Sequence, residues 1–87
     1  NRNPMGHERL EECVRSNLLT YLDDLQGQEP SNMYDMLLRV VEKPLLELVM
    51  EQARNNQSRA AQWLGLNRNT LRKKLVEHGL LPTTDKD

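Results

Sequence analysis

Apolar residues recur every three or four positions in two long segments of this 87-residue chain. The first segment spans residues 10–26, and a stripe of this spacing predicts an amphipathic helix. Gly27 and Pro30 follow it and predict a loop, after which Ser31 or Asn32 can cap the next helix. The apolar positions of the first segment are Leu10, Cys13, Val14, Leu18, Tyr21, Leu22 and Leu25.

The second segment spans residues 33–53 and is apolar over much of its circumference. A helix of this kind needs cover on several sides, and a chain this short offers little of it. The pattern therefore predicts a homodimer in which the first two helices of each subunit form an interleaved bundle. We expect the shared core to include Leu37, Val41, Leu45 and Leu48.

Pro44 lies inside this second segment. Proline lacks the backbone N–H, so it predicts a helix that is kinked near Glu42 and Lys43. The alternative is two separate helices, the first of which ends before Pro44.

Residues 54–81 predict two short helices joined by a tight turn. After a turn at residues 54–56, one helix is expected at 57–64 and another at 68–78. Gly65 can adopt the left-handed conformation that ends the first, Asn67 can cap the second, and Gly79 can end it. Leu71 and Leu75 would seat the second helix on Ala61, Leu64 and Leu66, with Trp63 in the core between the helices and Leu80 and Leu81 packed back at the end.

Basic residues are concentrated on the last helix of this pair. Residues 8–52 hold ten acidic and four basic residues, a net charge of −6, whereas residues 53–79 hold one acidic and six basic residues, a net charge of +5. Helix-turn-helix proteins place such a second helix in the DNA major groove. Arg68 and Arg72 lie one turn apart, and Asn67 and Arg68 lie at the N-terminal end, where base edges are usually read. A basic face exposed only to solvent is the alternative interpretation.

The run PLLELVMEQARNNQSRAAQWLGLNRNTLRKKL, residues 44–75, resembles the C-terminal half of the Fis family of bacterial nucleoid-associated proteins. Residues 10–50 also resemble the two longer helices of that family. The resemblance implies an all-α fold with four helices per subunit, two long helices forming an intertwined dimer core and a C-terminal helix-turn-helix. It also implies that the two reader helices of the dimer, the second helix of each helix-turn-helix, lie closer together than one turn of the DNA. The DNA must then bend and its central minor groove must narrow, and A/T-rich centres deform in this way at low cost.

The start of the helix at 57–64 exposes backbone N–H groups that suit an anion, with Gln57 and Ser58 beside them. The resemblance implies backbone contacts there and beside the reader face, and a contact of Arg54 with flanking DNA. The candidate DNA-binding residues are Arg54, Asn56, Gln57, Ser58, Arg59, Asn67, Arg68, Thr70, Arg72, Lys73 and Lys74.

The chain departs from the better-known members of the family in two places. Val76 and Glu77 stand where their last helix continues with lysines, which predicts a lower affinity for the DNA backbone. Residues 1–9 are expected to be a flexible lead in place of their β-hairpin arm, so inversion-stimulating activity is not expected, and residues 82–87 are expected to be a disordered tail. The intervening parts are assigned as dimerisation helices at 10–53 and a DNA-binding region at 54–81.

Other kinds of site find little support in the sequence. His7 and His78 are far apart and have no nearby Cys or His, so no metal site is predicted, and His78 fits the end of a helix dipole. No paired catalytic groups or phosphate loop appear, so we expect no enzyme and no cofactor. Cys13 is the single cysteine and fits a small apolar position in a reducing compartment. No signal peptide or membrane span is evident, which predicts a cytoplasmic protein, and the resemblance to the Fis family implies a place in the nucleoid.

The sequence therefore predicts a Fis-like homodimer that binds and bends DNA and regulates transcription. The expected partners are double-stranded DNA and a second copy of the chain, with RNA polymerase as a further candidate and no membrane. Two alternatives stay open. One is the DNA-binding domain of a sigma-54-dependent enhancer-binding activator, and the other is a dimeric helical adaptor that presents its basic face to an acidic protein.

Overall fold

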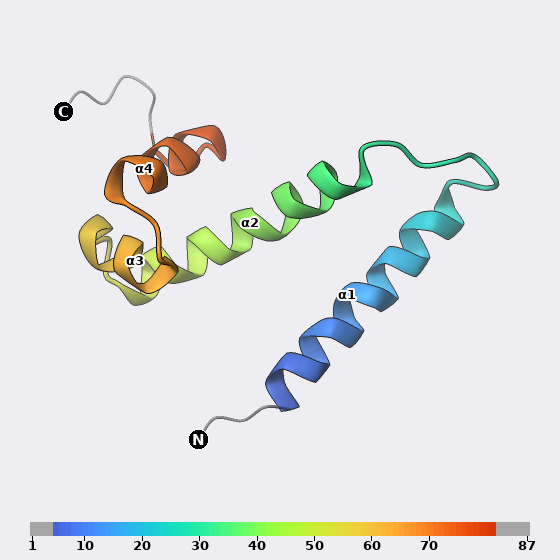
Figure 1. Ribbon diagram of the computed structural model, residues 1–87, viewed down its shortest axis with the longest axis horizontal. Coiled ribbons are helices and arrows are strands. Elements are labelled where there is room, and N and C mark those ends of the chain that lie inside the picture. The colour runs from blue at the N-terminus through green and yellow to red at the C-terminus, as the bar shows by residue number, and fades with distance from the viewer. Residues whose placement is uncertain (1–4, 82–87) are drawn as a thin grey trace. The chain divides into compact units, whose positions relative to one another are not determined.

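A computed structural model of the protein describes residues 5–81. Within these residues the chain forms four helices and no strand (Figure 1): α1 (Met5–Asp24), α2 (Met33–Gln52), α3 (Gln57–Leu64) and α4 (Arg68–Glu77). This confirms the predicted all-α class with two long and two short helices. The predicted lead at residues 1–4 and tail at residues 82–87 lie outside the described residues.

The chain divides into two units, Asn1–Met33 and Tyr34–Asp87. The division lies at the start of α2, because Leu46 of α2 and Ala53, which directly follows α2, share one core with α3 and α4. The border between dimerisation helices and DNA-binding region at residues 53 and 54 is a functional division and stays a prediction. The second unit therefore holds α2 together with the two short helices.

In the first unit, α1 begins at Met5, five residues ahead of the apolar stripe that starts at Leu10. Residues 5–9 are thus helical, so the predicted start of the first helix at residue 10 is wrong. Apolar side chains along α1 remain exposed, with Leu10 at 62% and Leu19 at 57%. Cys13 is exposed as well, and the side-chain amide of Asn17 donates a hydrogen bond to its carbonyl at 2.7 Å.

The connection from α1 to α2 contains three residues with positive φ. Gln26 and Gly27 have φ of 53° and 89°, and Asn32 has φ of 55°. An N-cap residue adopts an extended conformation, so Asn32 does not have the backbone of the cap we expected there.

α2 is one helix that passes through Pro44. The alternative of two helices separated at Pro44 is therefore wrong, while the kink near Glu42 stays a prediction. Proline removes one backbone donor, but hydrogen bonds on both sides of it can hold a helix together when the ring faces outward. Pro44 is exposed, in agreement with this.

The core of the second unit is small and aliphatic. Leu46, Leu71 and Leu75 are at most 1% exposed, and Ala53, Ala60 and Ala61 are at most 4% exposed. Burying a Leu side chain stabilises a fold by about 1.5–3 kcal/mol, and the short alanine side chains let helix backbones approach closely. Val49, Met50, Leu64, Leu66, Leu80 and Leu81 pack against this core.

Local hydrogen bonds fix where the short helices begin and end. Gly65, with φ of 76°, ends α3, and the N–H of Leu66 donates to the carbonyl of Ala61 at 2.9 Å, which is the long bond of a Schellman motif. The same motif ends α4, where Gly79 has φ of 74° and Leu80 N–H donates to the carbonyl of Leu75 at 2.7 Å. The predicted stops at Gly65 and Gly79 are confirmed.

One face of α2 carries exposed apolar side chains at alternating intervals of four and three residues. Their exposed fractions run from 43% to 77%. Such a 3.5-residue repeat is typical of a helix that packs lengthwise against another helix. The members of this α2 stripe are Tyr34, Leu38, Val41, Leu45 and Leu48.

Trp63 does not lie in the core. It is 53% exposed, and the guanidinium of Arg59 lies 5.8 Å from its ring centroid. The prediction of a core Trp63 is therefore wrong, because Ala60, Ala61 and Leu64 already form the inner face of this two-turn helix.

Candidate nucleic-acid interface

The turn between α2 and α3 holds two consecutive residues in the left-handed conformation. Arg54 has φ of 58° and Asn55 has φ of 62°. Arg54 takes the place that glycine usually occupies after a helix, because Asn55 N–H donates to the carbonyl of Met50 at 2.8 Å, the long bond of a Schellman motif. This conformation costs a non-glycine residue about 1–2 kcal/mol. Arg54 is exposed at this corner, which is the position that we predicted for a contact with flanking DNA.

Asn56 caps α3. Its side-chain oxygen accepts a hydrogen bond from Arg59 N–H at 3.1 Å, and its backbone is extended. Ser58 and the half-buried Gln57 follow in the first turn, and the side-chain oxygen of Gln57 is buried without a hydrogen-bond partner. The unbonded backbone donors of this turn give the end of α3 a partial positive charge that suits an anion.

Asn67 caps α4 in the same way, and the predicted cap is confirmed. Its Oδ1 accepts from Thr70 N–H at 2.8 Å. This bond leaves the amide group as the donor end of Asn67 and fixes the side chain at the start of the reader helix. Arg68 follows directly, and α4 ends at Glu77, one residue before the predicted end.

The two helix starts meet in one polar depression. Six residues line it: Asn55, Asn56, Gln57, Ser58, Arg68 and Arg72. A second depression is lined by Asn67, Arg68, Asn69 and Arg72. Arg68 and Arg72 border both hollows, so they bring guanidinium groups beside the start of α3. The structure thus brings six of the predicted DNA-binding residues to one surface: Asn56, Gln57, Ser58, Asn67, Arg68 and Arg72.

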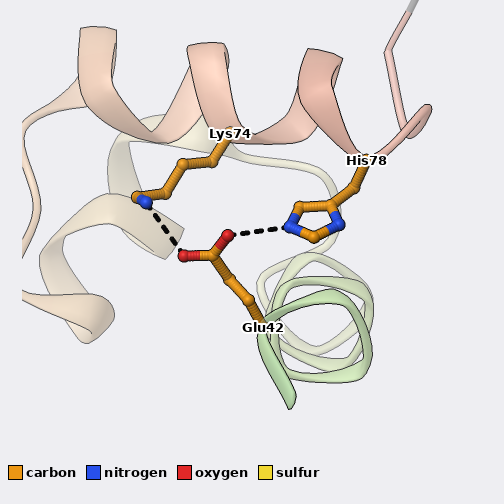
Figure 2. Close-up of polar contacts among 3 residues, drawn as sticks. All are labelled: Glu42, Lys74 and His78. Atoms are coloured by element: carbon orange, nitrogen blue, oxygen red, sulfur yellow. Dashed lines mark hydrogen bonds and ion pairs between the residues drawn. The ribbon is translucent and has the colours of Figure 1, made fainter. Parts of the chain in front are cut away.

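Lys74 has a different environment from the one we predicted. Its Nζ lies 2.9 Å from Oε2 of Glu42 on α2, and Nε2 of His78 lies 2.7 Å from Oε1 of the same carboxylate (Figure 2). The hydrogen bonds from Lys74 and then His78 lower the pKa of Glu42 below its ordinary value, against a smaller opposing effect of burial. The hydrogen bond to Glu42 correspondingly raises the pKa of Lys74.

Sequence reasoning missed this cluster of Glu42, Lys74 and His78. Lys74 and His78 are four residues apart and therefore share one face of α4, which is a signal that they could bind the same group. Their partner Glu42 on α2 is 32 residues from Lys74 and 36 from His78, and no local pattern identifies it. His78 is the C-cap residue directly after α4, in agreement with the predicted place at a helix C-terminus.

The other predicted contacts are spread around this surface. Lys73 is exposed on α4 and Thr70 is half-buried in its first turn. Arg59 lies over the ring of Trp63 on the exposed side of α3. Among the described residues no group of three or more His, Cys, Asp or Glu side chains could hold a metal ion. None of the four helices within residues 5–81 has the length and apolar character to cross a membrane.

Two short helices, a glycine turn between them and a capped, basic second helix define a helix-turn-helix protein. The sequence matches the family model described as "Bacterial regulatory protein, Fis family" over residues 37–78. It is 61% identical over 77 residues to a Fis-like DNA-binding protein of Ralstonia nicotianae, which covers 88% of this chain and 100% of the relative. It is 61% identical over 72 residues to a Fis-like DNA-binding protein of Neisseria meningitidis, covering 83% and 91% of the two chains. The DNA-binding protein Fis of Aliivibrio fischeri is 45% identical over 71 residues, covering 82% and 72%. The chain belongs to the Fis family.

Proposed function

We propose that this protein binds DNA as a homodimer, bends it and regulates transcription as a component of the nucleoid. The observation that carries the proposal is the meeting of Arg68 and Arg72 with the start of α3 in one polar hollow. A DNA phosphate seated there would be bonded by helix N–H groups while the start of α4 reaches base edges. Phosphate contacts of this kind set the register and base contacts supply the sequence preference.

The α2 stripe supports the dimer. Of the four predicted interface residues, Val41, Leu45 and Leu48 are 43%, 45% and 54% exposed in the single chain, and Leu37 is half-buried. A monomer would leave this row of side chains in water. The 3.5-residue repeat fits a second helix of the same kind, so a second copy of the chain is the occupant we propose, with the long helices of both copies forming an intertwined core.

The bending and the preference for A/T-rich centres follow from two reader helices on one dimer. Reader helices that lie closer together than one turn of DNA can both enter the major groove only if the DNA curves toward the protein. The cost of that curvature depends on the sequence between the two half-sites, which gives degenerate sites with A/T-rich centres. The cytoplasm would be the compartment, and RNA polymerase is a further candidate partner.

The comparisons favour a Fis-like regulator over the activator domain. The Ralstonia relative is matched over its full length by 77 residues, which leaves no space in that protein for an ATPase domain. The helical adaptor is separated from the regulator by affinity for random duplex DNA, which an adaptor would lack.

The test is a fluorescence-anisotropy titration on duplexes that differ only in their centre, A/T-rich or G/C-rich, at several salt concentrations. We expect binding that weakens as salt rises and is tighter for the A/T-rich centre. Gel mobility of circularly permuted fragments measures the bend on the same sequences. Equal affinity for both centres with no bend would contradict the mechanism, and no affinity for any duplex would contradict DNA binding.

A further inference from the structure

The side chain of Glu42 on α2 bonds two residues at the C-terminal end of α4. Both of its carboxylate oxygens are used, one by Lys74 at 2.9 Å and the other by His78 at 2.7 Å. Figure 2 shows the two side chains reaching from α4 to the same carboxylate on α2. The side chain of Glu42 is 26% exposed and that of His78 12%, so the contact is partly shielded from water.

The side chain of Lys74 points away from the face of α4 that carries Arg68 and Arg72, the reader face. Arg72 and Lys74 are two positions apart, which is about 200° around a helix axis. The Lys74 side chain therefore leaves the helix on nearly the opposite side from Arg72, toward α2. Leu71 and Leu75, both at most 1% exposed, lie between the two directions and form the apolar seat of the helix.

The contacts of Leu71 and Leu75 alone restrain rotation and sliding of α4 along α2 only weakly. Two leucines one turn apart fix the distance between α4 and the core, but apolar contacts have little directional preference. Hydrogen bonds have strict geometry, and two of them to one carboxylate restrain rotation and sliding of α4 along α2. Lys74 lies in the second half of α4 and His78 caps its end, so their bonds orient the first half of the helix, where Arg68 begins it.

We propose that Glu42 is a positioning residue for DNA recognition, which sets the angle of the reader helix on α2 through Lys74 and His78. Lys74 then acts inside the protein and does not contact a phosphate. The inference rests on the proposed function, because it explains how that function gains its sequence preference. Since α2 also carries the stripe assigned to the dimer, the same bonds transmit the geometry of the dimer to both reader helices.

The test compares Glu42→Gln with Glu47→Gln. Both variants lose one negative charge from α2, but Glu47 is exposed. Affinity is measured for an A/T-centred specific duplex and for a random duplex in full-length dimer. Loss of a charge changes both affinities by the same factor, since phosphate electrostatics carry no sequence information. Misplacement of α4 lowers only the specific affinity, and we expect Glu42→Gln to reduce the ratio of the two about tenfold, the size of one weakened base contact.

Three further variants test whether Lys74 is the partner through which Glu42 acts. Lys74→Met is expected to reduce the ratio as Glu42→Gln does, and the double variant Glu42→Gln/Lys74→Met is expected to be no worse than either single variant. Lys74→Arg keeps a charged donor and is expected to retain most of the ratio. If Glu42→Gln does not fold, Glu42→Asp replaces it, because the shorter side chain keeps the charge and loses reach toward both partners.

A ratio that is the same in Glu42→Gln and Glu47→Gln would overturn the proposal while leaving DNA binding intact. Equal loss of both affinities in Lys74→Met would also overturn it, since that is the signature of a phosphate contact. If the unmodified protein binds no duplex, the proposed function fails instead. The positioning bonds are then tested by urea unfolding of Glu42→Gln, Lys74→Met and the double variant. If the two single changes in the free energy of unfolding add up in the double variant, the bonds do not hold α4.

Discussion

Arg68 and Lys73 occupy different parts of α4, and single substitutions can separate their roles. Arg68 begins the helix beside the capping Asn67, and Lys73 is exposed further along. Arg68→Ala is expected to cost about 1–3 kcal/mol on the preferred site and to relax preference at one base pair. Lys73→Ala is expected to weaken all duplexes alike and to reduce the salt slope by about one unit.

Titrations of both variants on matched duplexes at two salt concentrations measure these effects. Lys73 is the better phosphate candidate here, since Lys74 is bonded to Glu42. A uniform loss across sequences for Arg68→Ala would make Arg68 a phosphate contact and assign base reading to other residues.

Arg54 combines a strained backbone with an exposed position. Arg54→Gly is expected to stabilise the fold by roughly 1 kcal/mol, because glycine adopts the left-handed conformation without steric cost. The same change is expected to weaken DNA binding through loss of the flanking contact. Urea unfolding and DNA titration measure the two effects.

Gly79→Ala is the control for the backbone effect. Gly79 has φ of 74°, and an added Cβ meets no heavy atom within 4 Å, so any cost comes from the backbone alone. We expect it to destabilise the fold by about 1 kcal/mol. If Arg54→Gly also destabilises, then the arginine side chain contributes more to the fold than its backbone costs.

Glu42 makes the stability of the second unit depend on acidity. Its pKa is lower in the folded state than the ordinary value of 4.5, because Lys74 and His78 donate hydrogen bonds to it. The unfolded chain therefore binds more protons in this range, and stability rises with pH. The contribution is complete above about pH 4.5, the ordinary value, and is lost as pH falls through the lower folded-state pKa.

Glu42→Gln is therefore expected to reduce the free energy of unfolding at pH 7 and to have a smaller effect at an acidic pH well below 4.5. Urea unfolding at both pH values, with Glu47→Gln as the control, checks the difference. A loss of equal size at both pH values would show that the carboxylate charge is not the cause.

The residues that local chemistry determines were predictable from the sequence. Asn67 and Gly65 act through groups within five residues along the chain, and both were placed correctly. Trp63 was misplaced because exposure depends on which side of α3 meets the core. Glu42 was missed because its partners lie more than 30 residues away in the sequence.

At the scale of the elements, the α2 stripe gives a direct test of the dimer. Leu45 is 45% exposed in the single chain, so Leu45→Ala would change the stability of a monomer little. In a dimer that buries it fully, the same change is expected to cost about 2–5 kcal/mol. Sedimentation and thermal unfolding at matched concentration measure the outcome.

Trp63→Ala serves as the control, because Trp63 is an exposed apolar residue outside the stripe. We expect it to leave the dimer unchanged. A folded monomer of the unsubstituted protein at micromolar concentration would refute the dimer.

The short helices were predicted better than the long ones, and for a physical reason. α3 begins and ends where we expected because both of its ends are defined by caps. α1 begins at Met5, five residues before the predicted start at Leu10. The prediction was poor because neither a capping residue nor a proline directly precedes Leu10. α2 continues through Pro44, which a single proline in a sequence does not reveal, because proline more often ends or kinks a helix.

At the scale of the whole molecule, the division into units was not predictable from composition. We placed a functional border between residues 53 and 54, and the net charge changes sign one residue earlier. The compact unit of the structure begins at Tyr34 instead, because Leu46 of α2 and Ala53, which directly follows α2, share one core with α3 and α4. One helix thus supplies the core of the reader unit on one face and the proposed dimer surface on another.

The α2 stripe also has a consequence for how DNA-site occupancy depends on the concentration of this protein in a cell. Under the proposed dimer, assembly is a second-order reaction, and the amount of dimer rises with the square of the total when most chains are single. The melting temperature would then rise with concentration as well. At low concentration, site occupancy would therefore respond to the rate of synthesis more steeply than in proportion, up to the square of the number of copies per cell.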